Sequence, residues 1–465
     1  MLRSDTMRST AAAFLFLSLS GCLKASDEPS VSPVDTAASD SLVADTGAAD
    51  STEAPDQAAP EDNPAPPDED VATIPDAGAP DAGNACPPVS PDRPPALSEH
   101  VGVFDPVKRR FILFGGNPEF AVCPGFAESV YLGDTWAFWV DCGVWEKLPS
   151  GPSARGRANA VYDAKDHAMV VFGGRWRASP TSGAYTVYND VWWLDLTTDT
   201  WSEVKATGAK PVGRANASAV WDSDQNRLLV FGGNKSTSGL SYQPLNDTVA
   251  LDLATDTWEK LAATGMPTAR LFAAAAYDST HKSLVITQGG DENAFSGPFL
   301  GDSWSLDLGT LKWKKLPSGG ASPDHRIWGT AAYSKAFDQV ILFGGHDDGA
   351  LGNRNDVWTL DAAGAWDVFQ ENDTFNKGPA GQCDFPPDFS NVALDAPERR
   401  SGHALAWSEE ENALYVHGGK SDCGLVDDVW RLDMDDGKWT ALQPASIGES
   451  CLRFSDSCID LCTGQ

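Results

Sequence analysis

Five arginines recur at one position of a repeated sequence unit, and their chemistry would be the binding of anions. Each lies 18 or 19 residues before the first glycine of a Gly-Gly pair. The five are Arg155, Arg214, Arg270, Arg326 and Arg400. Guanidinium groups bind carboxylates with two parallel hydrogen bonds, and the chain carries a net charge of −32. A ring of such groups predicts a local positive site for an anionic ligand. The alternative is structural, with each arginine bonded to loop carbonyls or to an aspartate.

Aromatic and basic side chains in segments of variable length form a second candidate group. Arg175, Trp176, Arg177 and Tyr185 follow the second Gly-Gly pair, whereas Tyr242, Phe295 and His346 follow later pairs. Aromatic rings beside polar groups are typical of sites for peptides and sugars. We therefore expect these residues to contact a protein or glycan ligand. The alternative is that the rings cover the bases of their own loops.

Histidines are the remaining candidates for chemistry. His100 and His403 hold matching positions in the first and last units, so they could approach one another as a weak metal site. His167 and His281 fall in short turns. No nucleophile beside a base, phosphate-binding loop or specific carboxylate pair occurs. We therefore expect no catalytic residue, no metal and no cofactor.

The cysteines predict an oxidising compartment. Apart from Cys22, the chain has an even set of eight: Cys86, Cys123, Cys142, Cys383, Cys423, Cys451, Cys458 and Cys462. In an exported chain such a set predicts up to four disulfides. One possibility joins Cys383 or Cys123 to Cys423. Another joins Cys86 to one of the last three cysteines.

Six repeated units position these residues. Each unit has a Gly-Gly pair after an apolar run, then an Asp-x-Trp motif such as Asp134-Thr135-Trp136, then a second Trp such as Trp145. Four short β-runs per unit are typical of propeller blades. All the length variation lies in two of the four connections, which leave an up-and-down sheet on the same side. Variable loops on a rigid scaffold usually bind ligands.

The Phe-Gly-Gly runs, the Asp-x-Trp motifs and the downstream tryptophans resemble the kelch repeat. The resemblance implies an all-β, six-bladed kelch-type propeller over residues 96–445, with the last blade against the first. Val249 replaces a Trp of the pattern, and Gln288 and His417 replace Phe. The segregation of loop variation to one face predicts a binding module without catalytic activity. Alternatives are a sugar-acting enzyme similar to sialic acid mutarotases and a copper oxidase-like kelch enzyme, although no Tyr-His pair occurs.

The ends of the chain predict export and anchoring. Residues 1–22 combine a basic start, an apolar run and Leu19-Ser20-Gly21-Cys22, which resembles the bacterial lipoprotein box. The resemblance implies lipidation of Cys22 and a place in the bacterial cell envelope, at the outer membrane. Residues 23–95 carry 16 acidic residues against Lys24 and Arg93, a balance of −14, and predict a disordered tether. Residues 446–465 form a Cys-rich tail. The acidic balance excludes nucleic acid as a partner, and we expect a monomer.

Overall fold

The computed structural model describes residues 86–119, 129–239, 241–294, 296–347, 352–375, 390–391, 395–421 and 424–446. The predicted signal peptide, most of the predicted tether and nearly all of the predicted tail lie outside these residues. The described residues form β-strands and no helix. Accordingly, no helix among them is long and apolar enough to cross a membrane.

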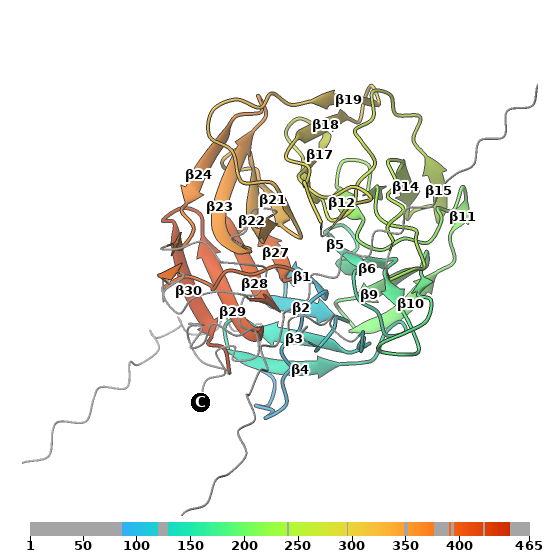
Figure 1. Cartoon of the computed structure of the whole chain (residues 1–465). Helices are drawn as coiled ribbons and strands as arrows, with labels where there is room; N and C mark the ends of the chain where they lie inside the picture. The colour runs from blue at the N-terminus through green and yellow to red at the C-terminus, as the bar shows by residue number, and fades with distance from the viewer. Residues whose placement is uncertain are drawn as a thin grey trace, which may run out of the picture. The chain divides into compact units, whose positions relative to one another are not determined.

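The strands form six blades around a central channel (Figure 1), so the predicted all-β, six-bladed propeller is confirmed. Each blade has four main antiparallel strands, A to D, in chain order from the channel outward. Blade 1 consists of β1 (Val101–Asp105), β2 (Arg110–Phe114), β3 (Thr135–Trp139) and β4 (Val144–Leu148). Blade 2 consists of β5 (Asn159–Asp163), β6 (Ala168–Phe172), β9 (Val191–Asp195) and β10 (Thr200–Val204). Blade 3 consists of β12 (Ser218–Asp222), β13 (Arg227–Phe231), β14 (Thr248–Asp252) and β15 (Thr257–Lys260).

Blades 4 to 6 repeat the order. Blade 4 consists of β16 (Ala274–Asp278), β17 (Ser283–Thr287), β18 (Ser303–Asp307) and β19 (Lys312–Lys315). Blade 5 consists of β21 (Thr330–Ser334), β22 (Gln339–Asp347), β23 (Asn353–Asp361) and β24 (Trp366–Gln370). Blade 6 consists of β27 (Ala404–Ser408), β28 (Ala413–Lys420), β29 (Leu425–Asp433) and β30 (Lys438–Gln443). Short extra strands are β7 (Arg175–Trp176), β8 (Thr186–Val187), β11 (Thr207–Gly208), β20 (Arg326–Ile327), β25 (Thr374–Phe375) and β26 (Ser390–Asn391).

The apolar runs before the Gly-Gly pairs become the second strand of each blade. Every residue of β2, β6, β13 and β17 is buried. Both faces of a blade pack on neighbouring blades, so these strands are apolar on both sides rather than alternating. The buried apolar clusters accordingly each combine residues from two adjacent blades.

The second Trp of a blade packs on the Phe of the preceding Phe-Gly-Gly run. The ring centres of Trp258 and Phe172 lie 5.4 Å apart, and those of Trp313 and Phe231 lie 5.0 Å apart. The same contact closes the ring, because Trp145 of blade 1 packs edge-on against His417 of blade 6 at 5.3 Å. The inner strands β1 and β27 also meet there.

The Gly-Gly pairs let adjacent blades approach closely. Gly115 has a φ of 72°, and a Cβ there would lie 2.5 Å from the carbonyl oxygen of Arg155 in the next blade. The Gly116 amide donates to that oxygen at 3.0 Å. Glycine meets both demands, a left-handed backbone and this close approach, at the lowest cost, and it takes this position in five of the six blades. The last blade repeats the bond to the first, from Gly419 N to Leu97 O at 2.7 Å.

Blade 4 corrects one sequence interpretation. Gln288 does not take the Phe position; it takes the position of the first glycine, with a φ of 64°. Its amide donates to the Asp302 carbonyl, as that of Gly173 does to Asp190. The Arg270 guanidinium bonds the Gln288 carbonyl 18 residues away, which is the separation in the other blades. Gly289 therefore holds the second glycine position of blade 4, and the 18-residue spacing from the arginine to the first glycine position also applies to Arg270.

The two faces of the ring differ as predicted. The A–B and C–D turns, here called the turn face, are short, and the residue before each B strand is left-handed, as at Arg109, His167 and Asn226. The B–C and D–A connections, here called the loop face, vary in length and carry the β7–β8 hairpin. A ligand surface would therefore be assembled on the loop face.

Candidate ligand-binding site at the channel mouth

The five repeated arginines are clamps inside the blades. Arg155 Nη1 and Nη2 lie 2.7 and 2.9 Å from the two carboxylate oxygens of Asp190. Arg155 Nη1 also donates to the carbonyl of Gly173 at 3.0 Å. The equivalent ion pairs are Arg214–Asp247, Arg270–Asp302, Arg326–Asp356 and Arg400–Asp428.

These arginines do not form the expected positive ring for a ligand. All five are at most 1% exposed, and each is neutralised by an aspartate of its own blade. Burial alone would raise the pKa of Asp190, but hydrogen bonds and the charge of Arg155 outweigh burial and hold that pKa below its ordinary value. The structural alternative therefore describes these side chains.

The mouth of the channel is formed by the residues two positions after the five clamps and two positions after Leu97, which holds the equivalent place in blade 1. All six residues are left-handed, with φ between 55° and 63°. They are Glu99, Arg157, Asn216, Phe272, Trp328 and Gly402. Backbone hydrogen bonds link neighbours around the mouth, from Arg157 N to Glu99 O at 2.8 Å and from Asn216 N to Arg157 O at 3.0 Å. A left-handed non-glycine residue costs about 1–2 kcal/mol, so the clamps and these bonds hold the mouth residues against that cost.

An ion pair and two aromatic rings occupy one side of the mouth. Arg157 Nη2 lies 2.5 Å from Glu99 Oε1. The Arg157 guanidinium carbon lies 5.2 Å from the ring centre of Trp328 and 5.6 Å from that of Phe272. The two rings meet edge to face at 4.7 Å. The mouth thus combines a cation with apolar ring surface, as binding hot spots do.

Arg157 has unused hydrogen-bonding capacity. Its side chain is 9% exposed, and among the described residues neither Nε nor Nη1 has a hydrogen-bond partner. A buried donor without an acceptor costs about 1–3 kcal/mol. Below the mouth, a channel of about 200 Å³ is lined by small residues such as Ala158, Ala217 and Ala273. A ligand group entering here could accept hydrogen bonds from Arg157.

A second layer of polar aromatic residues supports Glu99. The Tyr131 hydroxyl donates to Glu99 Oε2 at 3.3 Å and accepts from Arg175 Nε at 2.9 Å. The Arg175 guanidinium stacks on the Tyr185 ring, with its carbon 4.1 Å from the ring centre. The Tyr185 hydroxyl lies 2.8 Å from Ser129 Oγ. The predicted residues Arg175 and Tyr185 therefore reach the site, but as buried supports.

The electrostatics favour an anion at the mouth. Burial would raise the pKa of Glu99, but the charges of Arg157 and Arg175 and the hydrogen bonds from Arg157 and Tyr131 together outweigh burial and lower that pKa, so Glu99 is an anion at neutral pH. Burial and the Glu99 carboxylate raise the pKa of Tyr131 to about 12. Two guanidinium groups, Arg157 and Arg175, then face one carboxylate, Glu99. These three residues carry one excess positive charge.

The other predicted loop residues lie around this centre. Tyr242 contacts Phe272, with ring centres 6.5 Å apart. Trp176 pairs with Thr186 in the β7–β8 hairpin, and the Arg177 guanidinium stacks on Tyr185. His346 Nδ1 lies 3.4 Å from Asn353 Oδ1 in blade 5. Phe295 lies outside the described residues.

The candidate metal histidines His100 and His403 each form a hydrogen bond with another residue of the channel wall. His100 Nε2 lies 2.9 Å from Nδ1 of His417, and His403 Nε2 lies 2.6 Å from the Thr330 hydroxyl. All three imidazoles are buried, and burial lowers their pKa values, to about 3 for His417. Each imidazole forms one of these hydrogen bonds, and His100 Nδ1, His403 Nδ1 and His417 Nε2 have no hydrogen-bond partner among the described residues.

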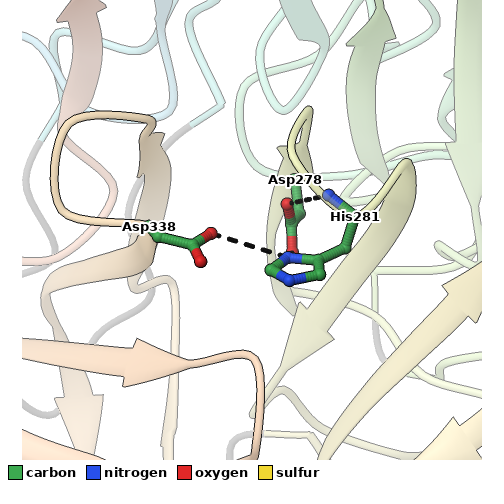
Figure 2. A group of neighbouring side chains, drawn as sticks. All are labelled: Asp278, His281 and Asp338. Carbon is green, nitrogen blue, oxygen red and sulfur yellow. Dashed lines mark hydrogen bonds and ion pairs between the residues drawn. The ribbon is translucent and has the colours of Figure 1, made fainter.

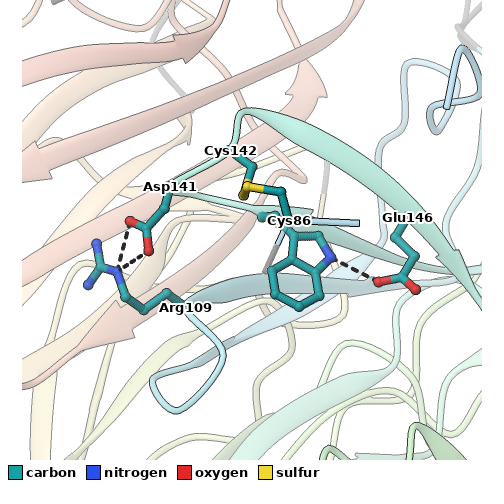
Figure 3. Close-up of a disulfide and its surroundings, with 6 residues drawn as sticks. Cys86, Arg109, Asp141, Cys142 and Glu146 are labelled. Atoms are coloured by element: carbon teal, nitrogen blue, oxygen red, sulfur yellow. Dashed lines mark hydrogen bonds and ion pairs between the residues drawn. A yellow bond between two sulfur atoms is a disulfide. The ribbon is translucent and has the colours of Figure 1, made fainter. Parts of the chain in front are cut away.

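The disulfide in the described residues differs from the predicted pairing. Cys86 bonds Cys142, in the C–D turn of blade 1, and not a tail cysteine (Figure 3). The adjacent Asp141 is ion-paired with Arg109. The remaining candidates, Cys123, Cys383, Cys423, Cys451, Cys458 and Cys462, lie outside the described residues. Cys86 and Arg93, which pairs with Asp427, therefore hold the last residues of the predicted tether against the propeller.

Sequence reasoning missed the mouth residues themselves. Glu99, Arg157, Phe272 and Trp328 differ in type, so no motif joins them. These residues could have been found from their constant place in the repeat, which is two residues after the clamp arginine or, in blade 1, after Leu97. The repeat was informative there through position and not through residue identity.

The geometry defines a class of protein, the closed six-bladed β-propeller built from Gly-Gly blades with clamped arginines and a narrow channel. The family model described as the KLHDC2/KLHL20/DRC7 Kelch-repeats domain matches residues 84–265 and 181–383. This match covers more than half of the chain. The chain therefore belongs to the kelch-repeat family.

Curated proteins from other organisms are similar in sequence to about two thirds of this chain. The Leucine-zipper-like transcriptional regulator 1 homolog of Drosophila melanogaster is 23% identical over 349 residues, which cover 63% of this chain and 33% of that protein. Kelch domain-containing protein 10 of Xenopus tropicalis is 24% identical over 306 residues, covering 64% and 67%. The chain spans only 33–39% of the length of three of the curated relatives it matches.

A solved structure shares the fold. The structure titled "Structure of YjhT" superposes with a TM-score of 0.54 at 17% identity, over 76% of this chain and 99% of that chain. At this identity the likeness concerns the fold alone.

Proposed function

We propose that this protein is a non-catalytic binding module that captures a protein or glycan ligand at the channel mouth of its loop face. Kelch propellers generally serve as scaffolds for interaction, and the fold is compatible with a binding module or with an enzyme. The particular ligand and the site are the proposal.

One observation carries it. Arg157 is nine-tenths buried at the mouth, yet two of its nitrogens have no acceptor among the described residues. Phe272 and Trp328 flank it. A carboxylate, or a carbonyl or hydroxyl group of a ligand, would satisfy these donors while its apolar part packs on the rings.

The test is a glycan and peptide array probed with the full chain carrying Cys22→Ser, followed by calorimetry on the best ligand. Arg157→Gly should lower affinity by at least about tenfold, since a hydrogen bond to a charged group contributes about 1.5–3 kcal/mol. Glycine suits this position because Gly402 occupies it in blade 6.

Asn216→Gly is the matched control, because it makes the same backbone change at the equivalent left-handed position of blade 3. Its affinity should stay within a few-fold of the unmodified protein. Equal affinity of the Arg157→Gly protein and this control would refute the proposed site.

A mutarotase acting on a carboxylate sugar is a second candidate. It is favoured by the Glu99 carboxylate 2.5 Å from the Arg157 guanidinium, beside the channel. Arg157 could hold the sugar carboxylate while Glu99 takes the proton of the anomeric hydroxyl as the bond between the anomeric carbon and the ring oxygen breaks. Glu99 would then give this proton to the ring oxygen, and the reverse steps after rotation of the open-chain carbonyl would close the other anomer. Exchange spectroscopy by NMR on sialic acid tests this, and an exchange rate equal to that in buffer would exclude it.

We also propose that a lipid on Cys22 anchors the protein in a bacterial cell envelope, at the outer membrane, with residues 23–85 as a spacer. The support is the order of basic, apolar and small residues before Cys22. Metabolic labelling with palmitate should label the protein, and Cys22→Ser should abolish labelling and release the protein from the membrane fraction. Unchanged membrane association of this variant would contradict the anchor.

A further inference from the structure

We propose that Asp278, His281 and Asp338 form a divalent metal site, with a ligand set suited to Zn²⁺, at the junction of blades 4 and 5 on the turn face. The site is separate from the channel mouth and does not depend on the function proposed above. It would join the A–B turn of one blade to that of the next.

The three side chains already converge (Figure 2). His281 Nδ1 lies 2.9 Å from Asp278 Oδ2 and 3.5 Å from Asp338 Oδ1. All three ligand atoms lie within 4.8 Å of one another. Zinc binds histidine and carboxylate ligands at about 2.0–2.2 Å in tetrahedral geometry, which puts neighbouring ligand atoms roughly 3.3 Å apart. The two shorter separations match that spacing.

No lysine or arginine of the described residues forms an ion pair with Asp278 or Asp338. Asp278 and Asp338 are paired only with His281 among the described residues, and the neighbouring Lys282 reaches Asp224 of blade 3 instead. The side chain of Asp278 is only 6% exposed. Two carboxylates around one imidazole therefore offer a place for a positive ion.

The equivalent turns of blades 1 and 3 show what is missing. There the aspartate that ends strand A faces an arginine across the hairpin, and the pairs are Asp105–Arg110 and Asp222–Arg227. In blade 4 the residue facing Asp278 is Ser283. Asp163 of blade 2 also lacks an arginine, since it faces Ala168, but it belongs to no three-ligand group in the described part of the chain.

Neighbouring groups orient two of the ligands. The Tyr333 hydroxyl lies 2.6 Å from Asp338 Oδ1 and 2.5 Å from the Thr280 hydroxyl. The His281 amide donates to Asp278 Oδ1 at 2.8 Å, which leaves Oδ2 toward the imidazole. Such outer contacts fix ligand geometry in metal sites.

A cavity of about 120 Å³ adjoins the three ligands. It is lined by Ser283, Ser305 and Tyr333 as well as by the ligands themselves. Three protein ligands and an adjoining cavity leave room for water in the remaining coordination positions. One imidazole nitrogen with two carboxylates favours zinc over calcium or magnesium, which prefer oxygen ligands alone.

The test uses the full chain carrying Cys22→Ser, freed of metal with a chelator, in competition with a chromogenic zinc chelator. Other groups, including the tail cysteines, can also bind zinc. The quantity compared is therefore the difference in bound zinc per molecule between the unmodified protein and each variant. The unmodified site should bind one more zinc than His281→Ala or Asp338→Asn, and zinc should raise the melting temperature only when the site is intact. Tyr333→Phe should weaken this zinc about 10–100-fold.

The matched control is His167→Ala. His167 also bonds an aspartate on the turn face, Asp105, but there Arg110 neutralises the carboxylate. The His167→Ala protein should bind as many zinc ions per molecule as the unmodified protein. Asp338 is 48% exposed, so the isosteric Asp338→Asn protein should keep its circular dichroism spectrum and remain informative if His281→Ala misfolds. Equal zinc counts in the unmodified and Asp338→Asn proteins would overturn the site, and binding of calcium in place of zinc would overturn the choice of metal.

Discussion

The turn face and the channel mouth each bury an arginine beside a carboxylate, but they use it differently. On the turn face, all three nitrogens of Arg110 donate, to Asp105, Asp199 and the Leu196 carbonyl. At the mouth, only Nη2 of Arg157 donates, and Nε and Nη1 are unpaired in the described structure.

The number of donors that each arginine uses inside the protein distinguishes an arginine that stabilises the fold from one that can bind a ligand. A buried cation with every donor used inside the protein stabilises one arrangement, and its removal leaves buried carboxylates unpaired. A buried cation with spare donors gains more when a ligand supplies an acceptor. Changes on the turn face should therefore alter stability, and changes at the mouth should alter binding.

The largest expected effect is that of Arg110→Ala. It removes the guanidinium partner of the fully buried Asp105 carboxylate, whose remaining side-chain partner is the His167 imidazole. We expect a loss of about 3–5 kcal/mol in the free energy of unfolding, measured by urea denaturation, with ligand affinity unchanged in the folded protein. A loss below about 1 kcal/mol would contradict the structural role.

Removal of the Cys86–Cys142 disulfide should come next. The bond closes a chain segment with a sequence separation of 56 residues on the turn face. Replacing both cysteines by serine should cost about 2–4 kcal/mol of stability, again by urea denaturation. Affinity at the mouth should be retained, and its loss would show that the two faces are coupled.

Acid should weaken the seam between blades 6 and 1. His417 has a folded-state pKa of about 3 because of burial and the Arg400 charge, against about 6.5 when unfolded. The unfolded chain binds the proton more readily, so stability is complete above about pH 6.5 and falls as the pH drops toward 3. We expect a loss of about 2 kcal/mol between pH 7 and pH 5 from this residue.

His417→Phe is the comparison for this pH effect, because it restores the Phe of blades 1, 2, 3 and 5. The variant should lose less stability than the unmodified protein between pH 7 and pH 5 in parallel denaturation curves. An identical pH dependence would assign the acid sensitivity to other groups.

The smallest effect on stability is expected for Arg157→Gly. Loss of the Glu99 ion pair is offset by relief of the left-handed backbone, which costs a non-glycine residue about 1–2 kcal/mol. We expect the free energy of unfolding to change by about 1 kcal/mol or less, although ligand affinity should fall by at least about tenfold. A destabilisation as large as that of Arg110→Ala would remove the contrast between the faces.

The sequence alone determined the architecture of the ring. Six Gly-Gly pairs, their apolar strands and the downstream tryptophans recur within short stretches, and short-range spacing is what local β-hairpins require. The placement of variable connections on one face followed from the same spacing, because an up-and-down sheet alternates its ends. The predicted six blades and their strand order could therefore be read directly.

Only the tertiary structure decided which charges meet. Arg155 pairs with Asp190, 35 residues away in its own repeat, and the spacing alone left open whether this arginine binds a ligand or that aspartate. Gln288 takes a glycine position because the blade register, and not the letter pattern, sets its backbone. The mouth joins Glu99, Arg157 and Trp328 from three blades, and Asp278 meets Asp338 across a blade junction. These contacts exist because the closed ring brings equivalent positions of successive repeats together, and residues of different type at those positions leave no motif in the chain.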